Sequence, residues 1–198
     1  HSLTHDIAEV RIQLVEPETI DFIAGQYVQL ESEEYKGRES VMRAYSISSV
    51  PSDNRHIELN IRKVPDGICT TWVFEYLTVG DDVRFNGPHG DFELTDNDAE
   101  LIFIAGGSGM APFRSMLMEM RHRQDPRTCR YFFGAVTRRD MFYIDEMKVF
   151  EEELPDFKFI PALSAPAESD EWDGETGLIT EVVGRQIGRA SCRERVCH

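Results

Sequence analysis

The feature that most constrains the fold is a run of five apolar residues, Leu101–Ala105, that leads directly into the glycine-rich segment Gly106–Pro112. A short continuous apolar run predicts a β-strand that is buried on both faces. Glycines let the backbone approach a ligand closely, Pro112 suits the first turn of a helix, and the N–H groups of a helix start favour phosphate. The segment predicts a nucleotide-binding strand, loop and helix, with a ligand-free tight turn as the alternative because the glycine spacing differs from the usual dinucleotide fingerprint.

Strand and helix patterns alternate through the second half of the chain. The predicted strands are Leu101–Ala105, Cys129–Gly134 and Phe157–Leu163, and the predicted helices are Ala111–Arg123 and Tyr143–Glu153. Strands separated by helices of this length imply parallel pairing. We therefore expect an α/β domain with a parallel sheet, beginning near residue 98.

The first half of the chain carries short alternating segments with turn signals between them, which predict an antiparallel β-barrel. The expected strands are Ala8–Leu14, Tyr27–Glu31, Ala44–Ser48, Ile57–Arg62 and Asp82–Asn86, with one helix at Thr70–Leu77. The fold class is thus a β-barrel plus an α/β domain, with domains at residues 1–97 and 98–185.

Composition narrows the class of partner. The formal net charge of −15, from 36 acidic and 21 basic residues, makes nucleic-acid binding and membrane contact by this segment unfavourable. The four cysteines lack a Cys-x-x-Cys spacing, so we expect no metal site and reduced thiols in the cytoplasm. Residues 186–198 resemble the in-frame translation of a DNA-sequencing adapter, and we expect this tail to be non-native and either disordered or loosely packed.

The strand segment Arg43-Ala44-Tyr45-Ser46 offers a cation, an aromatic ring and a hydroxyl to a flavin. Arg43 and Tyr45 alternate and therefore share a face, whereas Ser46 points the other way. The turn Gly67–Thr71 precedes the predicted helix, so its N–H groups and the hydroxyls of Thr70 or Thr71 suit a phosphate. Alone, such a strand is weak evidence, and its value comes from the glycine loop further along the chain.

With these motifs, the chain resembles the ferredoxin–NADP reductase superfamily, and most closely the F subunit of the Na⁺-translocating NADH:quinone reductase and the reductase components of bacterial oxygenases. The likeness runs from Gly25 to Val183 and includes Leu59-Asn60-Ile61-Arg62, Gly87–Phe92 and Trp172–Gly177. The resemblance implies a flavin-binding barrel followed by a nicotinamide-binding α/β domain, with FAD and NADH as cofactors. Residues so implied for cofactor binding are Arg43, Tyr45, Ser46, Asn60, Arg62, Gly67, Thr70, Thr71, Gly106, Gly107, Ser108, Gly109, Pro112 and Ser164, with Ser46 beside flavin N5 in the catalytic role.

The chain also departs from that family's pattern. Relatives continue past the third parallel strand with a further strand, a helix and a Cys-Gly-Pro-type loop, and we expect none of these here. We therefore expect a truncated α/β domain, an internal piece of a longer reductase, and little activity from the piece alone. Ser164 is followed by Ala165 and Pro166 where NADPH-using relatives carry an arginine, which favours NADH, although Arg138 and Arg139 are alternative cations.

The function predicted is that of a fragment of a flavin-dependent NADH oxidoreductase. It would pass electrons from NADH through FAD to an iron–sulfur or quinone-linked acceptor that another domain or subunit supplies. The parent protein would lie in the cytoplasm or on the cytoplasmic face of the inner membrane. The alternatives are a stand-alone flavin reductase and a non-catalytic flavin-binding regulatory module.

Overall fold

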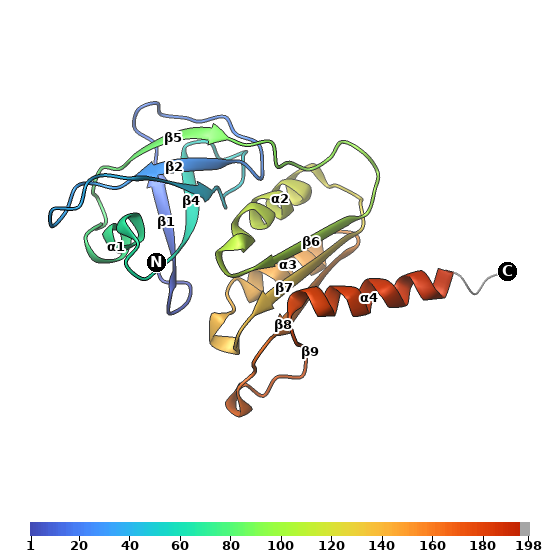
Figure 1. Cartoon of the computed structure of the whole chain (residues 1–198). Coiled ribbons are helices and arrows are strands. Elements are labelled where there is room, and N and C mark those ends of the chain that lie inside the picture. The colour runs from blue at the N-terminus through green and yellow to red at the C-terminus, as the bar shows by residue number, and fades with distance from the viewer. Residues whose placement is uncertain (195–198) are drawn as a thin grey trace. The chain divides into compact units, whose positions relative to one another are not determined.

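The computed structural model describes residues 1–194, which form two compact units (Figure 1). The first unit comprises residues 1–97 and 108–125, and the second comprises residues 98–107 and those from 126 onward. The second unit therefore differs from the domain predicted at residues 98–185. The difference arises because the helix that follows the glycine loop, residues 110–123, belongs to the first unit.

The first unit consists of two antiparallel sheets and two helices. One sheet pairs β1 (Ile7–Gln13) with β4 (His56–Arg62), and the other has the order β3 (Met42–Ser46), β2 (Tyr27–Glu31), β5 (Arg84–His89). Its helices are α1 (Ile68–Glu75) and α2 (Met110–Arg123). The antiparallel architecture predicted for this part of the chain is confirmed.

Alternation along the strands builds the core of the first unit. Val28 and Leu30 on β2 and Ile57, Leu59 and Ile61 on β4 are fully buried, as period-2 patterning requires. Trp72 of α1 packs into the same cluster with only 2% of its surface exposed. This core holds β3 and the start of α1 against a common apolar base.

The second unit contains a parallel sheet of four strands in the order β6 (Leu101–Gly106), β7 (Cys129–Ala135), β8 (Phe157–Leu163), β9 (Glu175–Thr176). The predicted parallel pairing is confirmed for β6, β7 and β8, whose register aligns Gly106 with Gly134 and Gly134 with Ala162. The unit also contains α3 (Ile144–Glu153) and α4 (Ile179–Glu194).

The two faces of the parallel sheet have different character. One face carries a chain of aromatic ring contacts that runs from Phe103 through Tyr131 to Phe133 and Phe159. On the other face, Phe132 and Ala162 pack against Val182 of α4, which is fully buried. Hydrophobic contacts on both faces are what a parallel sheet requires.

One prediction about the end of the chain is wrong. A further strand and a helix do follow β8: β9 pairs parallel with it, and α4 covers Phe132. Helix α4 continues from residue 186 to Glu194, within the residues that resemble an adapter translation, and their loose packing stays a prediction. Residues 195–198 lie outside the described part, so the expectation for them stays open.

Strand β6 forms one edge of the sheet, because among the described residues it pairs with β7 alone. The prediction that this strand is buried on both faces is wrong for one face: Ile102 and Ile104 are 44% and 43% exposed, whereas Phe103 is 5% exposed. An apolar edge strand is a template for pairing with another chain.

We expect Ile104→Lys to reduce concentration-dependent self-association, since a lysine on an edge strand disfavours docking of a second sheet. Sedimentation velocity across a range of protein concentrations measures the effect. The matched control is Val149→Lys, which adds the same charge on α3 at a site that is 39% exposed. Equal association of wild type and Ile104→Lys would contradict the role assigned to β6.

Candidate functional site

Strand β3 presents Arg43, Tyr45 and Ser46 in the way that its alternation predicts. In the register with β2, Arg43 lies opposite Leu30 and Tyr45 opposite Val28, so these side chains share one side of the sheet. Ser46 lies opposite Tyr27 and therefore faces the other side. Arg43 is exposed, and Tyr45 and Ser46 are half-buried, which leaves part of each side chain open to a ligand.

Arg43, Tyr45 and the first turn of α1 come together although they are far apart in sequence. Burial raises the pKa of the Tyr45 hydroxyl well above its usual value, and its hydrogen bond to the Cys69 thiol raises it further. Burial also raises the pKa of Cys69, against the opposing effects of that hydrogen bond and of the positive charge of Arg43. Because the Arg43 charge acts on both groups, the cation lies near Tyr45 and the helix start.

The turn before α1 is shaped for close approach of a ligand to backbone. Gly67 occupies the N-cap position and no side chain caps the helix, so the first-turn N–H groups have no side-chain acceptor. A Cβ on Gly67 would come within 2.6 Å of the Thr70 hydroxyl oxygen, so the turn admits no larger residue without movement. The Thr70 hydroxyl accepts from the N–H of Val64, which makes Thr70 part of the turn, whereas Thr71 is half-buried.

The two β4 residues in the predicted set have partners within the first unit. Asn60 is 4% exposed, and its Oδ1 accepts a hydrogen bond from the Ser48 hydroxyl at 3.4 Å. Arg62 is exposed, and its Nε donates to the Asp6 carboxylate at 2.7 Å. Burial of Asp6 favours its neutral form, but the hydrogen bonds and charges around it, those of Arg62 foremost, lower its pKa. The structure thus brings Arg43, Tyr45 and the Gly67 turn together and gives Asn60 and Arg62 other contacts.

The glycine loop connects β6 to α2 through a short 3-10 turn, Gly107–Gly109. Gly107 has φ +54°, a left-handed conformation that glycine adopts without strain. A Cβ on Gly106 would lie 3.0 Å from the Gly134 carbonyl oxygen, so the strand ends approach closely. No side chain caps α2 at Gly109, and Pro112 lies in its first turn, as predicted. Ser108 within the loop is half-buried.

Ser164 follows β8 and is exposed, with its N–H bonded to the Ala135 carbonyl. The segment after it is acidic, with a 3-10 turn at Glu168–Asp170. Arg138 donates its guanidinium to the Asp170 carbonyl at 2.8 Å and its backbone N–H to the Asp170 carboxylate at 3.2 Å. Arg138, the alternative cation for an NADPH phosphate, is therefore hydrogen-bonded to Asp170.

These features meet the chemical needs of two phosphate-bearing cofactors. Near β3 the donors are a guanidinium and the uncapped start of α1, with a half-buried aromatic ring beside them. At the glycine loop the donors are the backbone N–H groups at the start of α2. Among the described residues, no cluster of three or more His, Cys, Asp or Glu side chains could hold a metal ion. No helix in the same part of the chain is long and apolar enough to cross a membrane.

His89 was not among the residues predicted for the site, and the sheet register brings it into one row with Ser46. Tyr27 lies opposite Ser46 on one side and opposite His89 on the other, so the three residues form one row across β3, β2 and β5. The ring centroids of Tyr27 and His89 are 5.6 Å apart, and His89 Nε2 lies 2.8 Å from Asn86 Oδ1. The register of β2 against β5 was the missing information, since no local pattern places residue 89 in the same row as residue 46, with Tyr27 between them.

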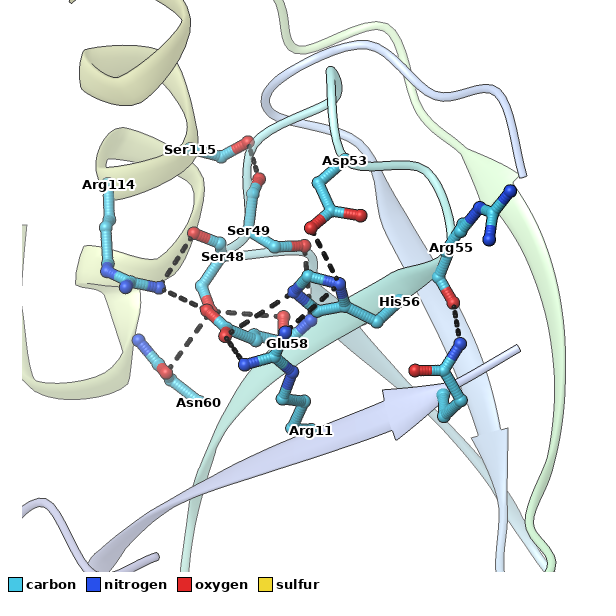
Figure 2. A network of polar contacts seen from close by, with 11 residues as sticks. Arg11, Ser48, Ser49, Asp53, Arg55, His56, Glu58, Asn60, Arg114 and Ser115 are labelled. Atoms are coloured by element: carbon cyan, nitrogen blue, oxygen red, sulfur yellow. Dashed lines mark hydrogen bonds and ion pairs between the residues drawn. The ribbon is translucent and has the colours of Figure 1, made fainter. Parts of the chain in front are cut away.

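A polar network between α2 and β4 was also missed (Figure 2). Arg114 of α2 forms an ion pair with Glu58 of β4, and Ser115 donates to the Ser49 carbonyl. The sequence signal was present, because a charged and a hydroxyl residue interrupt the apolar pattern in the first turns of α2. That signal cannot name their partners, which lie 56 and 66 residues away.

Comparison with known proteins identifies the two halves of the chain. Residues 1–94 match the oxidoreductase FAD-binding domain, and residues 103–196 match the oxidoreductase NAD-binding domain. The phenol hydroxylase P5 protein of Acinetobacter pittii is 40% identical over 185 residues, covering 91% of this chain and 50% of the relative. The F subunit of the Na⁺-translocating NADH-quinone reductase of Idiomarina loihiensis is 35% identical over 214 residues, covering 89% of this chain and 52% of the relative.

A solved structure shows the same arrangement of elements. The cytochrome P450 reductase GcoB of Amycolatopsis superposes with a TM-score of 0.84 at 28% identity, covering 95% of this chain and 55% of that one. The chain thus spans about half the length of the curated relatives it matches.

The proximity of Arg43 to Cys69 predicts how the thiol reacts. Because a nearby positive charge favours the thiolate, Arg43→Gln should raise the Cys69 pKa further and slow its alkylation at mildly alkaline pH. The pH dependence of iodoacetamide labelling, read on the Cys69 peptide by mass spectrometry, measures the shift. Arg43→Lys keeps the charge and should behave like wild type, and a Gln variant that alkylates as fast as wild type would place Arg43 elsewhere.

Proposed function

Because this chain belongs to the ferredoxin reductase family of FAD- and NAD-binding oxidoreductases, we propose that its first domain holds FAD beside β3 and its second domain binds NADH. The observation that carries the proposal is the meeting of Arg43, Tyr45 and the uncapped start of α1 in a domain of the FAD-binding type. A cation, a flat ring and helix N–H groups are the set that a flavin nucleotide requires.

In the proposed site each group has a distinct task. Arg43 and the backbone N–H groups after Gly67 would neutralise and orient the pyrophosphate. Tyr45, whose hydroxyl hydrogen-bonds to the Cys69 thiol, would stack on the flavin ring system. Ser46 would hydrogen-bond at flavin N5, reached from the opposite side of the strand.

The nicotinamide nucleotide would take its pyrophosphate contacts from the loop Gly106–Gly109, with Pro112 fixing the first turn behind it. When bound, the two cofactors would supply hydride transfer from the nicotinamide to the flavin, followed by release of the two electrons one at a time and of the proton to solvent. The protein itself would contribute orientation and electrostatics.

The role of the whole protein is also a proposal, because the chain spans about half the length of its curated relatives. We propose that electrons would pass to an iron–sulfur domain, a separate iron–sulfur protein or a quinone-linked acceptor. The parent would then act as an NADH-dependent reductase in the cytoplasm or at the cytoplasmic face of the membrane.

Flavin retention tests the first domain. The purified chain loaded with FAD should stay yellow after desalting, and Arg43→Ala should weaken FAD binding by about 1.5–3 kcal/mol through loss of a charged hydrogen bond. Fluorescence titration of FAD gives the dissociation constants. Arg55→Ala removes an exposed arginine from the turn before β4 and should leave them unchanged. Equal FAD affinity in wild type and Arg43→Ala would refute the assignment of Arg43.

Nucleotide choice tests the second domain. NADH should bind more tightly than NADPH, because Ala165 and Pro166 carry no charge and Arg138 lies against Asp170 within an acidic segment. Ala165→Arg should strengthen NADPH binding by on the order of 1 kcal/mol and leave NADH binding unchanged, since an exposed pair is partly screened. Calorimetric titration of both nucleotides decides the matter, and a wild-type preference for NADPH would overturn the prediction.

A further inference from the structure

Helix α2 is fastened to the segment that follows β3 by two adjacent residues. Arg114 donates from the same guanidinium nitrogen to the Glu58 carboxylate at 2.7 Å and to the Ser48 carbonyl at 3.1 Å. Ser115 donates its hydroxyl to the Ser49 carbonyl at 2.6 Å. Figure 2 shows both side chains reaching from the helix toward the strand that carries Glu58. We call Arg114, Ser115, Glu58, Ser48 and Ser49 the α2 clamp.

The clamp is closed by contacts between the Ser48–Ser49 segment and β4. The Ser48 N–H and hydroxyl both donate to the Glu58 carbonyl, at 2.8 and 3.0 Å. The Glu58 N–H in turn donates to the Ser49 hydroxyl at 3.2 Å. The carbonyl and the hydroxyl of both Ser48 and Ser49 are thus hydrogen-bonded, so the backbone of this segment has little freedom to shift.

The Glu58 carboxylate is a shared acceptor in a nearly dry environment. The side chains of Glu58 and Arg114 are 12% and 10% exposed. His56 Nε2 lies 3.8 Å and Arg11 3.9 Å from the other Glu58 oxygen, and Asp53 contacts His56 Nδ1 at 3.1 Å. Replacing a buried ion pair with apolar residues of similar size often leaves a protein at least as stable. The Arg114–Glu58 pair is therefore better suited to fixing a geometry than to adding stability.

The clamp joins two segments that the proposed function uses separately. Ser46, the proposed N5 partner, precedes Ser48 by two residues, and Tyr45 and Arg43 lie just before it on β3. Gly109, the end of the proposed pyrophosphate loop, precedes Arg114 by five residues, less than two turns of helix. A shift at either end of the clamp would therefore move groups that we assign to a cofactor.

We propose that Arg114, Ser115 and Glu58 are positioning residues that hold the end of the flavin strand and the start of α2 in the geometry that binds both cofactors. The inference rests on the proposed function, because it assigns these residues to the same two sites. None of the three touches a cofactor in this proposal. Each acts through the backbone of Ser48 and Ser49 or through the placement of α2.

The test is FAD and NADH binding to clamp variants of the full chain. Arg114→Met and Glu58→Gln should each weaken both affinities about tenfold and change the visible circular dichroism of bound FAD at saturation. The double variant should lose no more than either single variant, because both changes remove the same interaction. Arg114→Lys keeps the charge and should recover most of the affinity and the dichroism.

Two controls separate positioning from general loss of stability. Arg123→Met removes an ion pair on the same helix, in which the Arg123 side chain is 61% exposed and that of Glu119 10% exposed, and it should change neither affinity because neither residue contacts the Ser48–Ser49 segment. Leu59→Ala opens a cavity in the apolar core, on the opposite face of β4 from the Glu58 side chain, and should lower the thermal unfolding midpoint at least as much as Arg114→Met while preserving the dichroism of bound FAD.

The outcomes are distinct for the two claims. Wild-type affinities in Arg114→Met, or the same loss of affinity and dichroism in Leu59→Ala at a matched drop in midpoint, would overturn the positioning role and leave the proposed function standing. A wild-type chain that retains no FAD and binds no NADH would overturn the proposed function, and the positioning role with it.

Discussion

The ion pair between Arg114 and Glu58 ties helix α2 to strand β4 within the first unit. Removing one partner would leave a charge in a site where both side chains are about nine-tenths buried, at a cost of about 3–5 kcal/mol. That is a large share of the stability of an ordinary domain. Because Arg114 also donates to the Ser48 carbonyl, the same interaction orders backbone between β3 and β4. Stability and the placement of the proposed flavin strand are therefore linked.

The proposed flavin site depends on register as much as on residue type. Arg43 and Tyr45 share a side of β3 because each faces a buried residue of β2, whereas Ser46 joins the row of Tyr27 and His89. The sheet thus offers a cation and an aromatic ring on one side and a hydroxyl and an imidazole on the other. Helix α1 completes the first group, since the Arg43 charge acts on Cys69 in its first turn.

In the second unit the parallel sheet brings small residues into line. Gly106, Gly134 and Ala162 are cross-strand neighbours at the carboxyl ends of β6, β7 and β8, the edge at which open parallel sheets bind ligands. Contact with α4 explains why residue 134 is a glycine, because a Cβ on Gly134 would lie 3.0 Å from Ile179. Packing of α4 and access to the strand ends both require small side chains there.

Local pattern was enough to determine most of the elements and the class of each half. Period-2 alternation predicted β2 and the apolar run with its glycines predicted β6 and the start of α2, because strands and helix starts follow from neighbouring residues. The family and its FAD- and NAD-binding domains were predictable from the same motifs. Local pattern did not predict the exposure of Ile102 and Ile104, the added strand β9 or the length of α4. Each of these depends on what packs against the segment. Tertiary structure alone decided that Arg114 meets Glu58, that His89 lies in the row of Ser46, and that Asn60 and Arg62 have other partners. These contacts join residues far apart in the chain, and no periodicity in a single segment specifies which distant backbone will lie beside it.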